Sequence, residues 1–438
     1  MASWPGALSE KRGCTSLIVT IEVRVAYHFH ALHTDSTISP QRINKMPAST
    51  HKDPWLVHAD ALVLDGHADT PQRFVDEGWD FSGPLGTGML NLETARAGNL
   101  AAEFFAIWVE PHEWRGRFAY RTLQLIDGVY EQLRKHPTTM RLGLNADDIL
   151  SAHRDRIFCV LLGIEGGHSI EADLGLLRIY YRLGVRYMTL TWTNTHEWAD
   201  SSGDLDDPSI THHNGLTDFG REVIREMNRL GMMVDVSHVA DSTFHNVLET
   251  TRAPIIASHS SARALTNSPR NLTDEQLRAI ATNNGVVMVN FYSSFIDETW
   301  RVAWKATEPQ RRPLYAAAAA PWRERGEPVP YSIPLAVDRA FYAEHLQATL
   351  PRPPLHSLID HIDHIAQTAG IDHVGLGSDF DGFALLPAGL ESAADLPKIT
   401  AALMERGYTE SQMKKLLGGN LLRVFADVQD FAARAASE

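Results

Sequence analysis

The chain has 438 residues, 44% of them hydrophobic, and its 54 acidic residues against 40 Lys and Arg leave a formal net charge of -14. This length allows a large buried core, and one barrel enzyme with insertions commonly has roughly 200 to over 400 residues; two smaller domains are the less favoured alternative. The acidic balance disfavours nucleic acid as a partner, because no basic excess is available to neutralise phosphates. No apolar run approaches the roughly 18 residues that span a bilayer, so we expect no membrane partner.

The cysteine content bears on the cellular compartment. Cys14 and Cys159 are the only two cysteines, which excludes a disulfide framework and suits a reducing compartment. The best candidate for a signal peptide, residues 14–26, has Glu22 and Arg24 inside its apolar region and lacks a clear cleavage site. We therefore predict a cytoplasmic protein.

Residues 1–50 differ from the rest of the chain. They mix turn-forming residues with scattered histidines and one β-rich patch at residues 16–25, and Met46 comes just before the folded part begins. So short a patch cannot offset its own ordering entropy. We predict a leader that is disordered or results from an upstream start, followed by a single folded domain over residues 51–438.

Apolar runs recur from residue 60 onward, with helical patterns between them. The runs are continuous rather than alternating, as in parallel strands covered on both faces. Eight strands are predicted, at residues 61–64, 102–109, 157–164, 187–191, 232–236, 254–257, 286–290 and 373–376. Among the helices, residues 216–230 keep helical spacing up to Gly231, and Thr273 with Gln276 predicts a capping box. Strands alternating with helices predict an α/β fold, the (β/α)8 TIM barrel, with an open doubly wound sheet as the alternative.

Residues 297–354 do not fit this repeat. They separate the last two predicted strands by far more than one crossover, and they contain several prolines and three tryptophans. Because they follow the carboxyl end of a strand, they should rise over the catalytic face, and we predict a lid. The alternative is a helical insertion that makes oligomer contacts, and we allow for a homodimer. Residues 394–433 predict additional helices after the last strand.

Side chains that can bind metal follow five of the predicted strands. His67 and Asp69 close the first run, and because residues i and i+2 of a strand share a face, both can reach one divalent cation. The other residues are Glu165, His238, His259 and Asp379, each directly after the apolar run of its strand. A lone His-x-Asp is more often structural, but the carboxyl-terminal rim of a barrel would gather all six side chains. The pattern therefore predicts a metal site.

The number of these groups indicates two metal ions. Three histidines and two or three carboxylates exceed what one tetrahedral zinc requires. A carboxylate can bridge two cations that lie about 3.5 to 4 Å apart with a hydroxide between them. We expect Glu165 to be that bridge, which leaves Asp379 free as a base.

Eight short strings carry a resemblance to a known family. They are HAD at 67–69, GIEGGHS at 163–169, RYMTLT at 186–191, DVSHV at 235–239, SHSSA at 258–262, VNFY at 289–292, GSDFDG at 377–382 and NLLRVF at 420–425. Together, in this order over about residues 55–430, they resemble the membrane dipeptidase family, also called renal dipeptidase. The resemblance implies a binuclear zinc amidohydrolase barrel that cleaves dipeptides, including those with a D-residue at the carboxyl-terminal position, by means of a metal-bridging hydroxide.

The resemblance also implies a role for each site residue. It places one Zn²⁺ on His67 and Asp69, the other on His238 and His259, and Glu165 between the two ions. Asp379 would take a proton from the bridging water and pass it to the leaving amine. Arg270 matches the arginine that binds the substrate carboxylate, and a planar guanidinium suits that group. Tyr292 matches a neighbouring substrate contact.

One position departs from the family pattern. Better-known members carry a histidine after the Thr-Leu-Thr string to help hold the scissile region of the substrate, and this chain has Trp192 there. We expect His196, four residues later, to reach the same space from its loop. The departure puts the substrate range in doubt.

Two rival functions follow. One is hydrolysis of another small amide, such as an N-acyl amino acid, or of a lactone or phosphoester by a related barrel. Many such enzymes bridge their metals with a carboxylated lysine, and this chain has no lysine between Lys135 and Lys305. The other rival is a catalytically silent binding protein with the same barrel. This alternative stays open because Trp192 replaces the family's histidine.

Overall fold

The computed structural model describes residues 52–437, so the predicted leader at residues 1–50 lies outside the described residues. Nine strands form one sheet in the order β2-β1-β9-β8-β7-β6-β5-β4-β3, and an additional pairing of β2 with β4 closes eight of them into a barrel. All of the pairings are parallel. The predicted TIM barrel is confirmed, and the open doubly wound sheet is excluded.

Each predicted strand overlaps a strand of the barrel, and the largest shift is at β1, of which the predicted range 61–64 covers only the first two residues. The barrel strands are β1 (Val63–Ala68), β2 (Leu100–Trp108), β4 (Phe158–Glu165), β5 (Val185–Thr189), β6 (Met233–Asp235), β7 (Ile255–Ala257), β8 (Val286–Val289) and β9 (Val374–Leu376). One further strand, β3 (Met140–Leu142), was not predicted; among the described residues it pairs only with the first residues of β4 and lies outside the closed ring. Its residues Met-Arg-Leu form no continuous apolar run, which is the signal that predicted the other strands.

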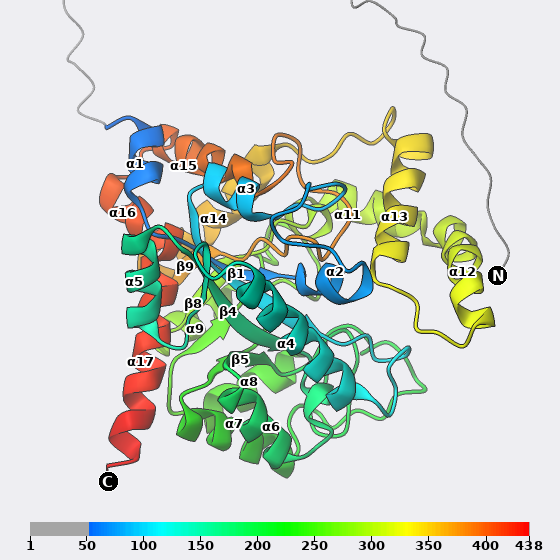
Figure 1. Cartoon of the computed structure of the whole chain (residues 1–438), viewed down its shortest axis with the longest axis horizontal. Helices are drawn as coiled ribbons and strands as arrows, with labels where there is room; N and C mark the ends of the chain where they lie inside the picture. Colours follow the sequence, from blue (N-terminus) through cyan, green and yellow to red (C-terminus); the bar gives the residue numbers. More distant parts are fainter. Residues whose placement is uncertain (1–51, 438) are drawn as a thin grey trace, which may run out of the picture. The chain divides into compact units, whose positions relative to one another are not determined.

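Helices surround the barrel (Figure 1). They are α1 (Pro54–Asp60), α2 (Pro71–Asp76), α3 (Leu92–Ala97), α4 (Phe118–Lys135), α5 (Ala146–Asp155), α6 (Leu174–Arg182), α7 (Asp218–Leu230), α8 (Asp241–Thr250), α9 (Asp274–Thr282), α10 (Ser293–Ile296), α11 (Glu298–Ala306), α12 (Glu308–Glu324), α13 (Ser332–Phe341), α14 (Leu355–Ala369), α15 (Leu396–Glu405), α16 (Glu410–Lys414) and α17 (Asn420–Ala435). The predicted capping box of Thr273 and Gln276 begins α9, and Gly231 ends α7 in the left-handed conformation with φ 78°. Within residues 52–437, no helix is both long and apolar enough to cross a lipid bilayer.

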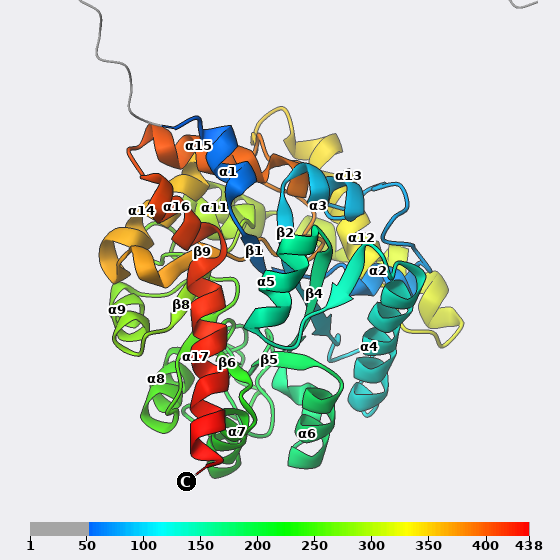
Figure 2. The same cartoon turned by 60° about the vertical axis from the view of Figure 1, so that its left-hand side comes forward.

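The inside of the barrel is filled by side chains at the end away from the site. Phe104 packs on Tyr187 and on Phe425 of α17, with ring centroids 5.0 and 6.1 Å apart. Leu421 of α17 belongs to the same buried cluster. Figure 2 shows α17 running along this side of the barrel. Because this packing closes one end, the polar chemistry is confined to the carboxyl ends of the strands.

The segment that breaks the repeat, residues 297–354, forms α11 to α13 between β8 and β9. Its helices share a small apolar core of their own around Trp300, Trp304 and Phe341. Arg311 of α12 bonds Asp338 of α13 at 2.9 Å and stacks 4.1 Å from the Trp304 ring, which ties these helices together. In Figure 1, α12 and α13 lie on the side of the barrel opposite to α17.

Candidate metal centre

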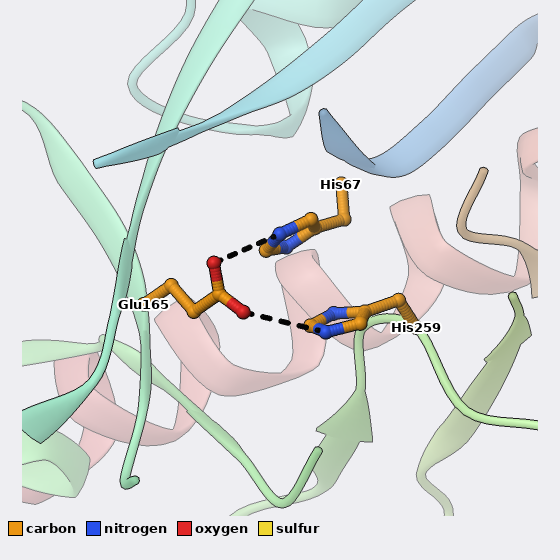
Figure 3. A group of neighbouring side chains, drawn as sticks. All are labelled: His67, Glu165 and His259. Carbon is orange, nitrogen blue, oxygen red and sulfur yellow. Dashed lines mark ion pairs between the residues drawn. The ribbon is translucent and has the colours of Figure 1, made fainter. Parts of the chain in front are cut away.

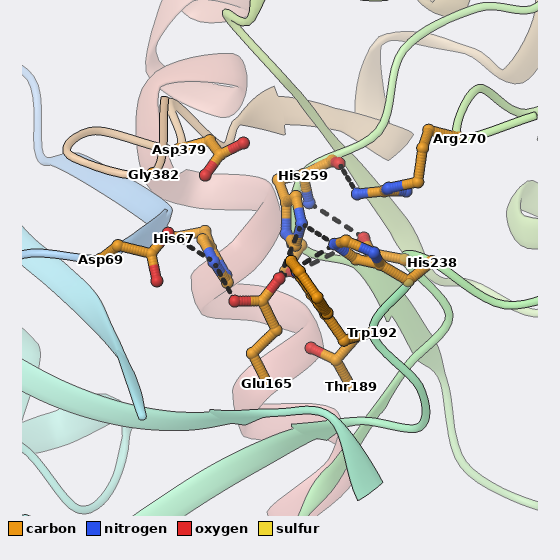
Figure 4. A network of polar contacts seen from close by, with 12 residues as sticks. His67, Asp69, Glu165, Thr189, Trp192, His238, His259, Arg270, Asp379 and Gly382 are labelled. Carbon is orange, nitrogen blue, oxygen red and sulfur yellow. Dashed lines mark hydrogen bonds and ion pairs between the residues drawn. The ribbon is translucent and has the colours of Figure 1, made fainter. Parts of the chain in front are cut away.

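The side chains predicted to bind metal meet at one rim of the barrel (Figure 4). His67 lies in β1, and Glu165 is the last residue of β4. His238, His259 and Asp379 lie on the loops that directly follow β6, β7 and β9. Because parallel strands in a closed barrel all end on the same rim, residues far apart in the sequence come together here.

Glu165 lies between the histidines (Figure 3). Its Oε2 is 3.3 Å from His67 Nε2. Its Oε1 is 2.9 Å from His238 Nε2 and 3.5 Å from His259 Nε2. One carboxylate therefore presents a different oxygen to each side of the cluster.

Two ligand atoms on the His67 side have no hydrogen-bond partner among the described residues. His67 Nε2 lies 3.7 Å from Asp69 Oδ2. Within residues 52–437, both His67 Nε2 and Asp69 Oδ1 are buried without a hydrogen-bond partner. Ligand atoms of His67, Asp69 and Asp379 all lie within 4.8 Å of one another. Buried polar atoms left without partners are costly, and a cation between them would remove that cost.

On the other side of the cluster, the protonation states of His238, His259 and Glu165 also suit a bound cation. Burial lowers the pKa of His238 to about 3 and that of His259 well below its ordinary value, so both imidazoles are neutral at neutral pH. Burial alone would raise the pKa of Glu165, but His67 and His238 hold it below its usual range, so the carboxylate is ionised. Neutral imidazole and ionised carboxylate are the forms that bind metal.

Residues behind the cluster fix how the ligands point, and the sequence analysis did not assign them. The Tyr187 hydroxyl and His67 Nδ1 are 2.8 Å apart, which directs His67 Nε2 toward Glu165. Ser258 Oγ contacts His259 Nδ1 at 2.7 Å and donates to Asp235 Oδ2 at 2.5 Å. Such partners set the tautomer and the orientation of a ligating histidine.

Asp379 lies beside the cluster in a strained backbone conformation. Its φ is 61°, and that of His238 is 69°. Positive φ at a residue other than glycine is costly and concentrates at functional sites. Asn290 Nδ2 donates to Asp379 Oδ2 at 2.9 Å. Burial, supported by the charge of Glu165, raises the pKa of Asp379 to about 6, which suits a group that takes up and releases a proton near neutral pH.

Arg270 offers unused donors near the histidines. Its Nη2 donates to the His259 carbonyl at 3.3 Å, whereas Nε and Nη1 are buried without a partner among the described residues. Burial lowers its pKa only to about 10, so the guanidinium is charged at neutral pH. Two buried, charged donors require an anion.

His196 and Tyr292 have other surroundings. His196 Nε2 is 2.8 Å from the Leu190 carbonyl, and its ring packs 4.6 Å from Trp198. The Tyr292 ring lies 5.0 Å from both Phe295 and Phe383. Substrate contacts of His196 and Tyr292 stay predictions.

Aromatic rings line one side of the cluster. Trp192 lies 6.3 Å from the His238 ring and 4.8 Å from Trp108, and Trp108 lies 4.7 Å from Tyr331 of the insertion. A cavity of about 350 Å³ between the insertion and the barrel is lined by Trp108 and Tyr331 among others. Tyr331 was missed because nothing in its local sequence distinguishes it.

Comparisons with known proteins agree with this geometry. The family model described as "Membrane dipeptidase (Peptidase family M19)" matches residues 55–438. The chain belongs to the membrane dipeptidase family. This confirms the resemblance found in the sequence.

Solved structures of other proteins are similar to this chain. The probable dipeptidase PvdM from Pseudomonas aeruginosa is 25% identical, with a TM-score of 0.72, over 86% of this chain and 98% of its own. A metallopeptidase from Rhodobacter sphaeroides, solved with a phosphinate mimic of the dipeptide L-Ala-D-Ala, is 28% identical, with a TM-score of 0.65, over 84% of this chain and 100% of its own. Family and neighbours identify the chain as a metal-dependent dipeptidase, a hydrolase of peptide bonds.

Proposed function

We propose that this dipeptidase binds two zinc ions and hydrolyses dipeptides, including those with a D-residue at the carboxyl-terminal position. The observation that carries the proposal is the position of Glu165, whose two oxygens face His67 on one side and His238 on the other. A single ion would need only one of these oxygens. Zinc fits the donor set, because neutral imidazole and carboxylate oxygen are among its usual protein ligands.

The ligands divide into two groups that share Glu165. His67 and Asp69 would hold one ion, and His238 and His259 the other. Zinc bound there would supply a nucleophile at neutral pH and stabilise negative charge on the scissile carbonyl oxygen. The buried ligand atoms without partners on the His67 side support this fit.

Asp379 and Arg270 complete the reaction. Asp379 lies within reach of the Asp69 and His67 ligand atoms and would carry a proton from the nucleophile to the leaving amine. The free Nε and Nη1 of Arg270 would bind the terminal carboxylate of the substrate. A site that reads a terminal carboxylate next to the scissile bond favours dipeptides over longer peptides.

Two finer points of the proposal concern the stereochemistry of the substrate and the cellular compartment. A D-residue at the second position is suggested by the L-Ala-D-Ala mimic bound to the Rhodobacter sphaeroides protein. A cytoplasmic location is suggested by the cysteine content of the chain.

The decisive experiment combines metal analysis with a substrate screen. The purified protein, loaded with zinc, should contain two zinc ions per chain by mass spectrometry of the metals. It should hydrolyse L,L- and L,D-dipeptides faster than tripeptides and N-acyl amino acids. One zinc ion per chain would contradict the bridging role of Glu165, and activity on N-acyl amino acids without dipeptide hydrolysis would replace the proposed substrate.

A further inference from the structure

Tyr331 of the insertion reaches the edge of the metal cluster. It lies directly before α13, and its hydroxyl donates a hydrogen bond to the Gly382 carbonyl. Its ring packs 4.7 Å from Trp108, the last residue of β2. This contact joins the insertion to the loop after β9, which carries Asp379.

Gly382 lies against the cluster. A Cβ atom at this glycine would be 2.1 Å from Asp379 Oδ1 and 2.4 Å from Asp69 Oδ2. The carbonyl that accepts the Tyr331 hydrogen bond therefore belongs to a residue in direct contact with both carboxylates. Tyr331 is the residue of the insertion whose hydroxyl lies next to this part of the site.

The hydrogen bond determines what Tyr331 can offer a ligand. A phenol has one proton to donate, and here the Gly382 carbonyl takes it. The lone pairs of the Tyr331 oxygen remain free, so it presents an acceptor. The neighbouring groups, Asp69 and Asp379, are carboxylates, and acceptors next to negative charge suit a cationic donor.

The substrate has such a donor at one end only. Figure 4 shows Arg270 beyond His259, on the side away from Asp69 and Gly382. If Arg270 holds the terminal carboxylate, the amino end of a dipeptide that lies across the metals points toward Asp69 and Gly382. That end carries an ammonium group.

We propose that Tyr331 recognises the free α-ammonium group of the dipeptide by accepting a hydrogen bond from it. The inference rests on the proposed dipeptidase function and adds a specificity-determining residue that the insertion supplies. It also implies that the insertion contributes to substrate selection. An N-acyl amino acid lacks the ammonium group and therefore cannot donate this hydrogen bond to Tyr331.

The test compares two substrates that differ only in this group, L-Ala-L-Ala and N-propionyl-L-alanine. Tyr331→Phe should lower kcat/KM for the dipeptide about tenfold or more, since hydrogen bonds to charged groups are among the stronger ones. Values for the propionyl compound, as a substrate or as a competitive inhibitor if its turnover is too slow, should change less than about twofold. Zinc content should match the wild type, and loss of the hydrogen bond to Gly382 should lower the melting temperature by only a few degrees.

Tyr315→Phe is the matched control, because Tyr315 lies in α12 and its hydroxyl bonds Asp338 within the insertion. It should leave the ratio of the two substrates unchanged. An equal loss for both substrates in Tyr331→Phe would assign Tyr331 a structural role and overturn the inference, as would no loss for either. If the zinc-loaded wild type hydrolyses no dipeptide, the proposed function fails and this inference falls with it.

Discussion

Burial and neighbouring charges together set the ionisation states of Glu165, His238, His259 and Asp379. His238 and His259 are neutral because they are buried next to the Arg270 cation, and Glu165 is ionised because histidines surround it. Asp379, which lies near Glu165 and has one partner in Asn290, keeps a raised pKa instead. The same set of residue types therefore yields metal ligands and a proton carrier.

Glu165→Gln tests the shared carboxylate. The amide keeps the shape but loses the negative charge, so it cannot bridge two cations. We expect less than two zinc ions per chain and a loss of activity of about 100-fold or more. Glu131→Gln, on the exposed face of α4, is the control and should retain both metal and activity. Full zinc content in Glu165→Gln would argue against the bridge.

Asp379→Asn tests the proton carrier. We expect kcat to fall about 100-fold or more while the zinc content is retained, because general acid and base catalysis contributes roughly that much. The pKa of Asp379 is raised to about 6, and bound cations would lower it, so the wild type should lose kcat/KM as the pH falls through a midpoint no higher than about 6. The variant should lack this acidic limb; an unchanged pH profile would assign the limb to another group.

Close packing between strands decides where the ligands point. Gly163 of β4 leaves room for the Tyr187 ring of β5, and a Cβ atom at Gly163 would lie 2.1 Å from Tyr187 Cζ. Tyr187 in turn holds His67 of β1. A glycine in one strand thereby affects a metal ligand two strands away in the barrel.

Gly163→Ala should consequently affect both stability and metal binding. Overpacking of this kind costs about 1–3 kcal/mol in the free energy of unfolding, and a displaced Tyr187 would weaken zinc affinity. Gly375→Ala in β9, where the nearest atom to a Cβ would be at an ordinary 3.4 Å, is the matched control. Chemical denaturation and zinc titration measure the two effects. Equal stability of both variants would show that the Tyr187 ring can move aside without cost.

At the scale of the whole molecule, the site connects strands from all around the barrel. β1, β4, β6, β7 and β9 each contribute a residue to it, and the insertion adds Tyr331. Ions bound there join parts of the chain that unfolding would separate. Metal binding should therefore stabilise the entire barrel.

Removal of the metal with a chelator should lower the melting temperature. An ion present at 1,000 times its Kd stabilises the folded state by about 4 kcal/mol, so we expect a shift of at least about 5 °C for two ions, measured by calorimetry at a fixed scan rate. Added zinc should restore the original value. A melting temperature that is the same with and without metal would mean that the folded and unfolded chains bind the ions equally.

The order of the strands, the helix caps and the ligand types were determined by the sequence itself. Continuous apolar runs predict buried parallel strands, and the first ligand of each contributing strand follows its run within three residues, so the local pattern was sufficient to find the ligands. The short β3 was missed because its residues Met-Arg-Leu form no continuous apolar run, and Tyr331 was missed because nothing in its local sequence distinguishes it. The roles of His196 and Tyr292 stay predictions.

Only the tertiary structure decided how the groups meet. Glu165 faces ligands on two sides of the cluster. Tyr187 contacts His67, which lies 120 positions away in the sequence, and Tyr331 bonds Gly382, which lies 51 positions away. Such contacts depend on closure of the barrel and on the paths of its loops. Periodicity and residue type describe one element at a time, and therefore they define the chemistry available to the site but not its geometry.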